Sequence, residues 1–515
     1  MNGALRFLIA IVLVLFATLF VLNAFESERP WINHDVGYHT YLGKEMAQGA
    51  ALYVDLKEDN PPGNPILLGL IAVFAETLSL PDFIATHLFV LLLGVVGLIV
   101  LRRSFARPEN SLVAFLVSCA YLLAIIRPGY SNNLYADAIG LPYDFGQREQ
   151  LFVLLFLPYL ARRLAGRGGD RTAFLGWVVM LGFVSTFKPF WGPMVLVVEG
   201  FRLIRTRRLE WWPLLSLALG ALLPILLLAV HSPASAHRFL FENIPMYLRG
   251  GYDHYATPFA DFAMSALHLQ IVAGFLLLAL LAGVASIRGW LPTRENLLLL
   301  ATAAMSYFAL WHQHKFWSYH ALPIFGVTLF AIAYLIGSAR AKIDLKRPAI
   351  PLLALLVTAL VSLSTLFSAA TMLQRYPPLG AFLVPAAERY ERTMYFSMSV
   401  MVQYPPLLLD RPMLGPWTVL LDLPELVALP DGVERERALL DYFGAIRDEV
   451  HQQRPQLLIF SPQAQALPAG VTLHQLIERY DGIPPGEYRE VTAQALGVNS
   501  PLARGWRFYI SVRPQ

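Results

Sequence analysis

The 515-residue chain is 56% hydrophobic and 15% charged, with a mean hydropathy of +0.51. Because soluble globular proteins carry about 25% charged residues, this composition excludes a soluble protein for most of the chain and indicates a polytopic membrane protein. The net charge of +4 is small and the arginines cluster between apolar segments, which argues for topology signals and against nucleic-acid binding. Cys119 is the only cysteine, so no disulfide can form within the chain.

The first apolar segment, 7–24, follows Arg6 and is expected to be a retained transmembrane helix. A cleaved signal peptide is the alternative. The segment is longer than the usual hydrophobic region of a signal peptide, and no small-residue cleavage site follows it.

A polar segment comes next, with Asp35 between His34 and an aromatic-rich helix start. An acid at the mouth of an apolar bundle lies where a membrane-bound donor and a water-side acceptor can meet. Asp35 is therefore the first candidate for chemistry, as a general base. The alternative is a solvated or helix-capping carboxylate.

Apolar segments near the ~20 residues that cross a bilayer recur along the chain. Segment 65–80 is also apolar, but it contains Glu76 and follows Pro61-Pro62. If it does not cross, all five basic loops fall on one side of the membrane, which the positive-inside rule makes cytoplasmic. We therefore predict eleven spans, a cytoplasmic N-terminus, an extracytoplasmic C-terminus and a re-entrant or interfacial helix at 65–80. The predicted spans are about 7–24, 83–101, 111–126, 150–161, 172–187, 190–204, 211–230, 270–287, 296–311, 319–337 and 349–371.

The outer loops, 25–64, 127–149, 231–269 and 312–318, then carry further candidates. Asp144 can orient the base or hold a cation. Arg148 suits phosphate because its planar guanidinium binds two oxygens at once. Lys188 lies in a tight outer turn, where it marks either a ligand pathway or a snorkelling anchor.

The segment 311–320 is rich in His, Lys and aromatic residues. His314, Lys315 and His320 offer hydrogen-bond donors to an anionic head group. The alternative is an interfacial aromatic belt, which explains Trp317 and Tyr319. No metal site is predicted, because these histidines have no carboxylate at a familiar ligand spacing and the chain lacks H-E-x-x-H.

From about 372 the pattern changes to that of a small α/β domain, 372–515, outside the cytoplasm. It contains no G-x-G-x-x-G or P-loop motif. Strands are expected at 419–421, 457–460 and 506–512, and helices at 434–453 and 471–480.

These features, in this order, resemble the GT-C superfamily of polytopic membrane glycosyltransferases. The likeness is strongest to the branch of protein O-mannosyltransferases and aminoarabinose lipid A transferases. It rests on the first-loop acid Asp35, segment 49–55, the Pro61-Pro62 pair, a non-spanning helix, a late outer loop rich in Lys, His and Tyr, and an outer C-terminal domain. It covers about residues 1–371, the predicted GT-C-like transmembrane domain.

The resemblance implies a polyprenyl-phosphate-linked sugar as donor and Asp35 as base on the acceptor hydroxyl. Asp144 matches a second acid that assists the base or a metal, which leaves a divalent cation such as Mg²⁺ or Mn²⁺ open as a cofactor. Lys315 and His320 would hold the donor phosphate. Further donor or substrate contacts are expected at His314, Arg148, Lys188, Tyr38 and Asp55. Related enzymes often carry Lys at the position of Asn60.

The expected protein is thus an α-helical polytopic membrane glycosyltransferase of the cytoplasmic (inner) membrane. On the outer face it would transfer sugar, with inversion, to an envelope glycan, lipid or protein. The alternatives are a flippase or transporter, a polymerase or ligase of lipid-linked glycans, and a non-catalytic assembly subunit. No nucleic-acid partner is expected.

Overall fold

A computed structural model describes residues 32–106, 110–126, 146–166, 171–248, 258–315, 318–342, 380–397, 404–409, 411, 413–415, 420, 423–461, 471–500 and 503–512. The chain divides into two compact units. Unit 1 comprises 1–30, 83–224 and 257–376, and unit 2 comprises 31–82, 225–256 and 377–515. The domain boundary expected near residue 372 stays a prediction. The predicted spans 7–24 and 349–371 lie outside the described residues.

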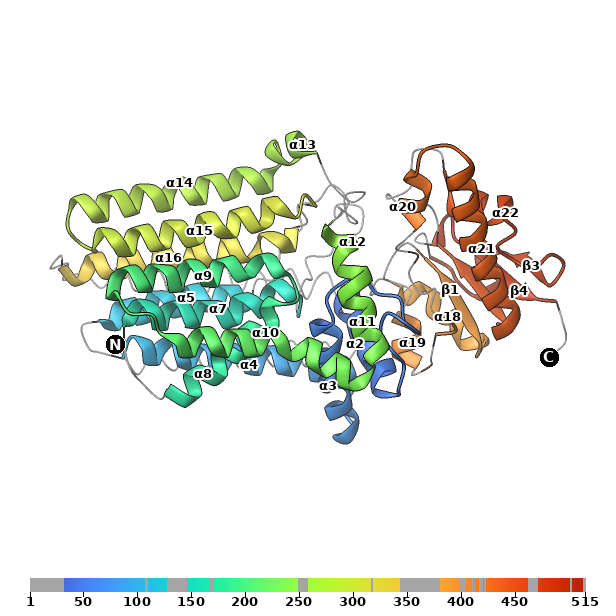
Figure 1. The fold of residues 1–515 in the computed structure, drawn as a ribbon, viewed down its shortest axis with the longest axis horizontal. Coiled ribbons are helices and arrows are strands. Elements are labelled where there is room, and N and C mark those ends of the chain that lie inside the picture. Colours follow the sequence, from blue (N-terminus) through green and yellow to red (C-terminus); the bar gives the residue numbers. More distant parts are fainter. Residues whose placement is uncertain are drawn as a thin grey trace. The chain divides into compact units, whose positions relative to one another are not determined.

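Unit 1 is built from long apolar helices that run alongside one another (Figure 1). Helix α16 (Leu322–Lys342) is at its centre, because it contacts α5, α7, α14 and α15 and fully buries Val327 and Phe330. Its other long helices are α4 (Asp82–Ser104), α5 (Ser111–Ile126), α7 (Arg148–Ala165), α8 (Arg171–Ser185), α9 (Gly192–Thr206), α10 (Trp211–His231, which ends in unit 2), α14 (Ala266–Ile287) and α15 (Thr293–His312). Its short elements are η2 (Pro189–Trp191), α13 (Phe259–Ala263) and η5 (Ser318–Ala321).

Each predicted span within the described residues is a helix. The short run at 150–161 extends to the 18 residues of α7, as a span would require. Four helical segments are long and apolar enough to cross a membrane, among the residues described: Asp82–Ser104, Trp211–His231, Leu267–Ile287 and Tyr319–Ala339. A mostly helical fold with a small C-terminal sheet is confirmed, whereas the count of eleven spans stays a prediction.

Ion pairs link neighbouring helices near the C-terminal end of α7. Arg163 donates to Glu199 of α9 at 2.6 Å and to Glu210 at 2.8 Å. Arg205 of α9 pairs with Glu295 of α15 at 3.1 Å. Since Arg163 and Glu199 are both buried, each needs the other to balance its charge. Helix α9 is thereby fixed to both α7 and α15.

Unit 2 begins with two packed helices, α2 (His34–Ala47) and α3 (Gly63–Thr77). A Cβ added at Gly69 would lie 2.7 Å from the Gly43 carbonyl oxygen, so glycine is needed for this close approach. Helix α3 has 15 residues. Its opposite side exposes apolar residues, Leu70, Val73 and Phe74, followed by Leu78 just after the helix. The re-entrant or interfacial position of 65–80 stays a prediction.

The segment after α10 in unit 2 is also helical. It contains α11 (Pro233–Arg238), a five-residue π-helix η3 (Phe239–Asn243) and α12 (Ile244–Leu248). Such π-turns are rare and occur often at functional sites.

The C-terminal part of unit 2 contains a four-stranded sheet in the order β1-β2-β4-β3. Strands β1 (Thr393–Phe396) and β2 (Leu457–Phe460) are parallel, with Thr393 beside Leu457. Strand β4 (Arg507–Ser511) lies antiparallel to β2 and to β3 (Tyr488–Val491). The helices of this part are η6 (Ala381–Leu383), α18 (Val384–Arg389), α19 (Tyr404–Leu409), α20 (Leu423–Ala428), α21 (Val433–Gln453), α22 (Leu473–Arg479) and η8 (Ala493–Leu496).

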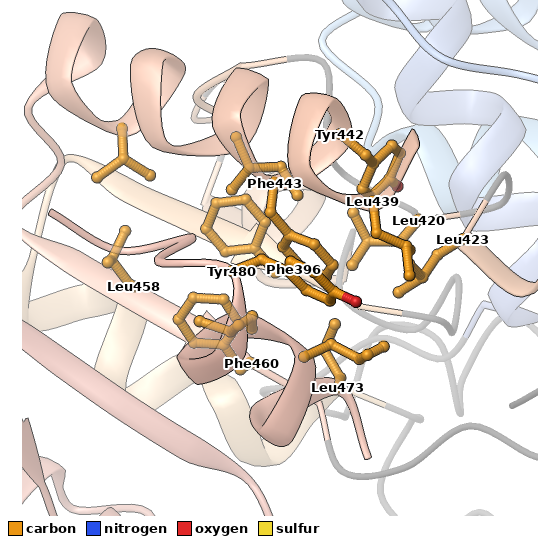
Figure 2. Close-up of a cluster of buried hydrophobic side chains, with 14 of the residues drawn as sticks. Phe396, Leu420, Leu423, Leu439, Tyr442, Phe443, Leu458, Phe460, Leu473 and Tyr480 are labelled. Atoms are coloured by element: carbon orange, nitrogen blue, oxygen red, sulfur yellow. The ribbon is translucent and has the colours of Figure 1, made fainter. Parts of the chain in front are cut away.

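The core of this domain forms where α21 and α22 cover one face of the sheet. Phe396 and Phe460 stack at 4.7 Å on neighbouring strands, and Phe443 of α21 stacks on Tyr480 at 5.6 Å. Figure 2 shows these aromatic side chains meeting between helix and sheet. The strands at 457–460 and 506–512 and both helices are confirmed, while the strand expected at 419–421 falls largely outside the described residues.

The glycine contact between α2 and α3 can be tested by stability. We expect Gly69→Ala to lower the Tm of the detergent-purified protein, because overpacking a close contact costs about 1–3 kcal/mol. Gly283→Ala is the matched control, since a Cβ there meets nothing within 4 Å. Equal Tm values for the two variants would contradict the close contact.

Candidate active site

Asp35 lies in the first turn of α2. Asn33 caps this helix, since its side-chain oxygen accepts the N–H groups of Asp35 at 2.9 Å and Val36 at 3.2 Å. The positive end of the helix dipole favours a carboxylate at this place. The Asp35 side chain is 15% exposed, and its Oδ1 lies 3.5 Å from Nε2 of His34. The cap thus fixes the backbone at Asp35, and the carboxylate keeps some exposed surface.

Tyr38, one turn further along α2, is buried. Its hydroxyl donates to the carbonyl oxygen of Lys57 at 2.8 Å and so joins α2 to the loop that leads to α3. Asp55 lies in that loop, is exposed, and accepts the Ala51 N–H at 2.8 Å. In the described structure Asp55 closes a turn, and substrate contact by Tyr38 or Asp55 stays a prediction.

Glu58 and His39 form a buried pair behind the same loop. The ring Nδ1 of His39 lies 3.9 Å from Oε2 of Glu58, and both side chains are at most 2% exposed. The other oxygen of Glu58 accepts the backbone N–H and the side-chain amide of Asn60, each at 2.5 Å. Glu58 thus shapes the turn that enters Pro61-Pro62 and α3.

Unit 1 contains a second cluster of ionisable residues, where α7 begins. Glu149 is fully buried and forms an ion pair with Lys188, which precedes η2. Lys188 also donates to Oε1 of Gln313 at 2.8 Å, and its ammonium lies 5.4 Å from the ring centre of Tyr319. The Nε2 atom of His320 lies 3.7 Å from Glu149 Oε1. We call Arg148, Glu149, Lys188, Gln313, Lys315 and His320 the Glu149 cluster.

The Glu149 cluster contains three cationic side chains. Arg148, Lys188 and Lys315 all act electrostatically on the buried ring of His320. Lys188 is paired with Glu149, and Arg148 and Lys315 also have interaction partners. Fixed cations in a partly buried site interact strongly with an anionic group.

The structure thus brings together four of the predicted phosphate-binding residues: Arg148, Lys188, Lys315 and His320. His314 adjoins Lys315 in a left-handed conformation (φ 51°), with its ring 5.3 Å from Trp311. Asp144 lies outside the described residues. The roles assigned to all these residues stay predictions.

Glu149 and Gln313 were not predicted as site residues. The sequence did contain a signal for Glu149, because an acid at the start of an apolar span needs a nearby cation. The identity of that cation, Lys188, depends on how α7 packs beside η2, which no local pattern encodes. Gln313 is recognisable only from its contact with Lys188.

The buried ion pair predicts strong coupling between its partners. We expect Glu149→Gln and Lys188→Met each to lower the Tm substantially, because removing one partner of a buried pair costs about 3–5 kcal/mol. The double variant should regain much of that loss, because neither charge is then left alone. Thermal unfolding of the four proteins measures the coupling, and additive losses would contradict it.

No protein-family model and no curated protein sequence matches the chain. Among solved structures it is similar to ArnT from Cupriavidus metallidurans bound to undecaprenyl phosphate, with TM-score 0.52 and 14% identity over 100% of both chains. The apo state of ArnT from the same organism gives TM-score 0.48 and 15% identity, over 90% of this chain and 93% of the other. The first of these likenesses shows that the chain shares the ArnT fold, so the resemblance expected from the sequence is confirmed at the level of the fold.

Proposed function

We propose that the chain is an integral membrane glycosyltransferase that takes its sugar from a polyprenyl-phosphate carrier. The observation that supports the proposal is the Glu149 cluster of unit 1, in which Arg148, Lys188 and Lys315 act on the buried His320. The fold supports the same reading, because a crystal structure of ArnT with this fold contains undecaprenyl phosphate.

The charge of the Glu149 cluster suits the leaving group of this reaction. A polyprenyl-phosphate-linked sugar is a phosphodiester with one negative charge. When the bond between the anomeric carbon and the phosphate oxygen breaks, the electron pair stays on that oxygen and a second negative charge develops. Cations fixed before the reaction stabilise this charge more in the transition state than in the ground state. Arg148, Lys188 and Lys315 are the residues proposed for this role.

Asp35 is proposed as the general base. Its partly exposed carboxylate would accept the proton of the acceptor nucleophile as that atom attacks the anomeric carbon. The Asn33 cap fixes the backbone at Asp35, and His34 lies beside its carboxylate, which favours productive geometry. One displacement of this kind inverts the anomeric centre. Asp144 remains a proposed assistant to Asp35.

The proposed reaction takes place on the outer face of the cytoplasmic membrane, with an envelope glycan, lipid or protein as acceptor. Eleven spans and an extracytoplasmic domain at 372–515 belong to this proposal and rest on the alternation of basic loops. Within the described residues, no group of three or more His, Cys, Asp or Glu side chains could hold a metal ion.

Asp35→Asn tests the catalytic role. We expect transfer from a panel of radiolabelled polyprenyl-phosphate sugars to fall at least ~100-fold, because a lost general base typically costs 10²–10⁴-fold. Donor binding should stay within about twofold of wild type, since the amide keeps the shape of the carboxylate.

Glu76→Gln is the matched control, because this acid is exposed on α3 in the same unit. Asp35→Asn protein that folds and transfers sugar at the wild-type rate would assign the base elsewhere, with Asp144 next. Vectorial movement of intact donor without transfer would instead identify a flippase.

Lys315→Met tests donor binding. We expect the KM for the donor to rise about tenfold with kcat changed less, because a charge-assisted hydrogen bond to phosphate contributes about 1.5–3 kcal/mol and Lys315 is partly exposed. Arg288→Met, at an exposed arginine in a basic loop, should leave the KM unchanged. Equal KM values for both variants would exclude Lys315 from the donor site.

A further inference from the structure

The loop between α2 and α3, residues 48–62, is held by side chains that bond its backbone carbonyls. Three donors come from a single distant segment, 231–243, which begins with the last residue of α10. His231 contacts the Ala50 carbonyl oxygen at 3.1 Å. Arg238 donates to the carbonyl of Tyr53 at 2.8 Å, and Asn243 donates to that of Glu58 at 3.0 Å.

The π-helix η3 explains why one segment reaches two places in this loop. Arg238 and Asn243 are five residues apart, and i→i+5 hydrogen bonding brings such a pair toward one side. An α-helix would place them well apart around its axis. Between them, buried Phe239 stacks on the Tyr53 ring with centroids 5.4 Å apart. Two hydrogen bonds and one ring contact therefore converge on the loop.

The loop needs such support because Tyr53 adopts a left-handed conformation, with φ 68°. This conformation is strained for a residue with a large side chain and persists only where its surroundings impose it. Arg238 binds the Tyr53 carbonyl, Phe239 packs on its ring, and the Tyr53 hydroxyl donates to the Asn60 carbonyl at 2.7 Å. Each contact opposes relaxation of the backbone.

We infer that Arg238 and Asn243 are positioning residues that hold the 48–62 loop in its strained form and so set the orientation of the start of α2. The connection to α2 is the Tyr38 hydroxyl, which donates to the Lys57 carbonyl from a place one turn after Asp35. The expected effect on catalysis rests on the proposed function of Asp35. The restraint of the loop by Arg238 and Asn243 rests only on the observed contacts.

Hydrogen exchange of the full chain in lipid nanodiscs tests directly whether Arg238 and Asn243 restrain the 48–62 loop. The reporters are the amides of Tyr53, which donates to Leu56 at 2.7 Å, and Val54, which donates to Ala51 at 3.0 Å. We expect Arg238→Met and Asn243→Ala each to speed exchange of these amides about three- to tenfold. Arg238→Lys should restore most of the protection, because lysine keeps a donor for the Tyr53 carbonyl.

Glu242→Gln is the matched control for Arg238. It removes only the exposed ion pair of Glu242 with Arg238, whose atoms are 3.8 Å apart, and should leave the exchange rates unchanged. If Arg238→Met does not fold, the comparison of Asn243→Ala with Glu242→Gln decides. Unchanged exchange in folded Arg238→Met and Asn243→Ala would overturn the inference, whatever the activity.

Transfer kinetics test the connection to catalysis. We expect Arg238→Met to lower kcat about tenfold with the donor KM within twofold, and Arg238→Lys to recover most of the kcat. A residue that serves stability alone would move the Tm and leave kcat unchanged. Faster exchange with unchanged kcat would overturn the catalytic connection. Faster exchange in a protein whose wild type uses no donor would support the hold on the loop and overturn the proposed function.

Discussion

The need to balance one buried carboxylate determines how the residues are arranged where α7 begins. Glu149 has no exposed surface, and an isolated charge in such a place costs several kcal/mol. Lys188 and His320, from two other parts of unit 1, lie beside Glu149. Lys188 also donates a hydrogen bond to the side chain of Gln313. Arg148 and Lys315 add two more cationic side chains that act on His320.

In unit 2, polar side chains form hydrogen bonds with the backbone of the loop between α2 and α3. The 48–62 loop contains turns and one isolated β-bridge but no helix or longer strand, so several of its carbonyls need side-chain donors. Tyr38, Arg238 and Asn243 supply them, and Glu58 organises the turn before Pro61-Pro62. The result is a stiff connection between the helix that carries Asp35 and the short apolar helix α3. Preorganisation of this kind favours catalysis because little ordering is left to the reaction step.

The C-terminal domain is also joined to α2. The Met413 N–H donates to the Tyr41 hydroxyl at 3.0 Å, with both residues buried. Burial raises the pKa of Tyr41 well above its usual range, with a further contribution from Glu45, so the hydroxyl stays neutral. Lys57 of the loop lies 5.5 Å from the ring centre of Tyr442 on α21. The C-terminal part of unit 2 thus contacts the helix that carries Asp35 and the loop that follows it.

The sequence by itself determined what depends on local composition. Apolar runs predicted the helices of unit 1, the charge pattern predicted α21, and Asp35 with Arg148, Lys188, Lys315 and His320 were candidate residues. Strands β1 and β3 were missed because they are short and lack the unbroken aliphatic run, Leu457-Leu458-Ile459, that marked β2. Only the tertiary structure decided that Glu149 pairs with Lys188, 39 residues away, and that Arg238 bonds Tyr53, 185 residues away. Such pairs follow from how the helices pack, because the partners are not neighbours in the sequence.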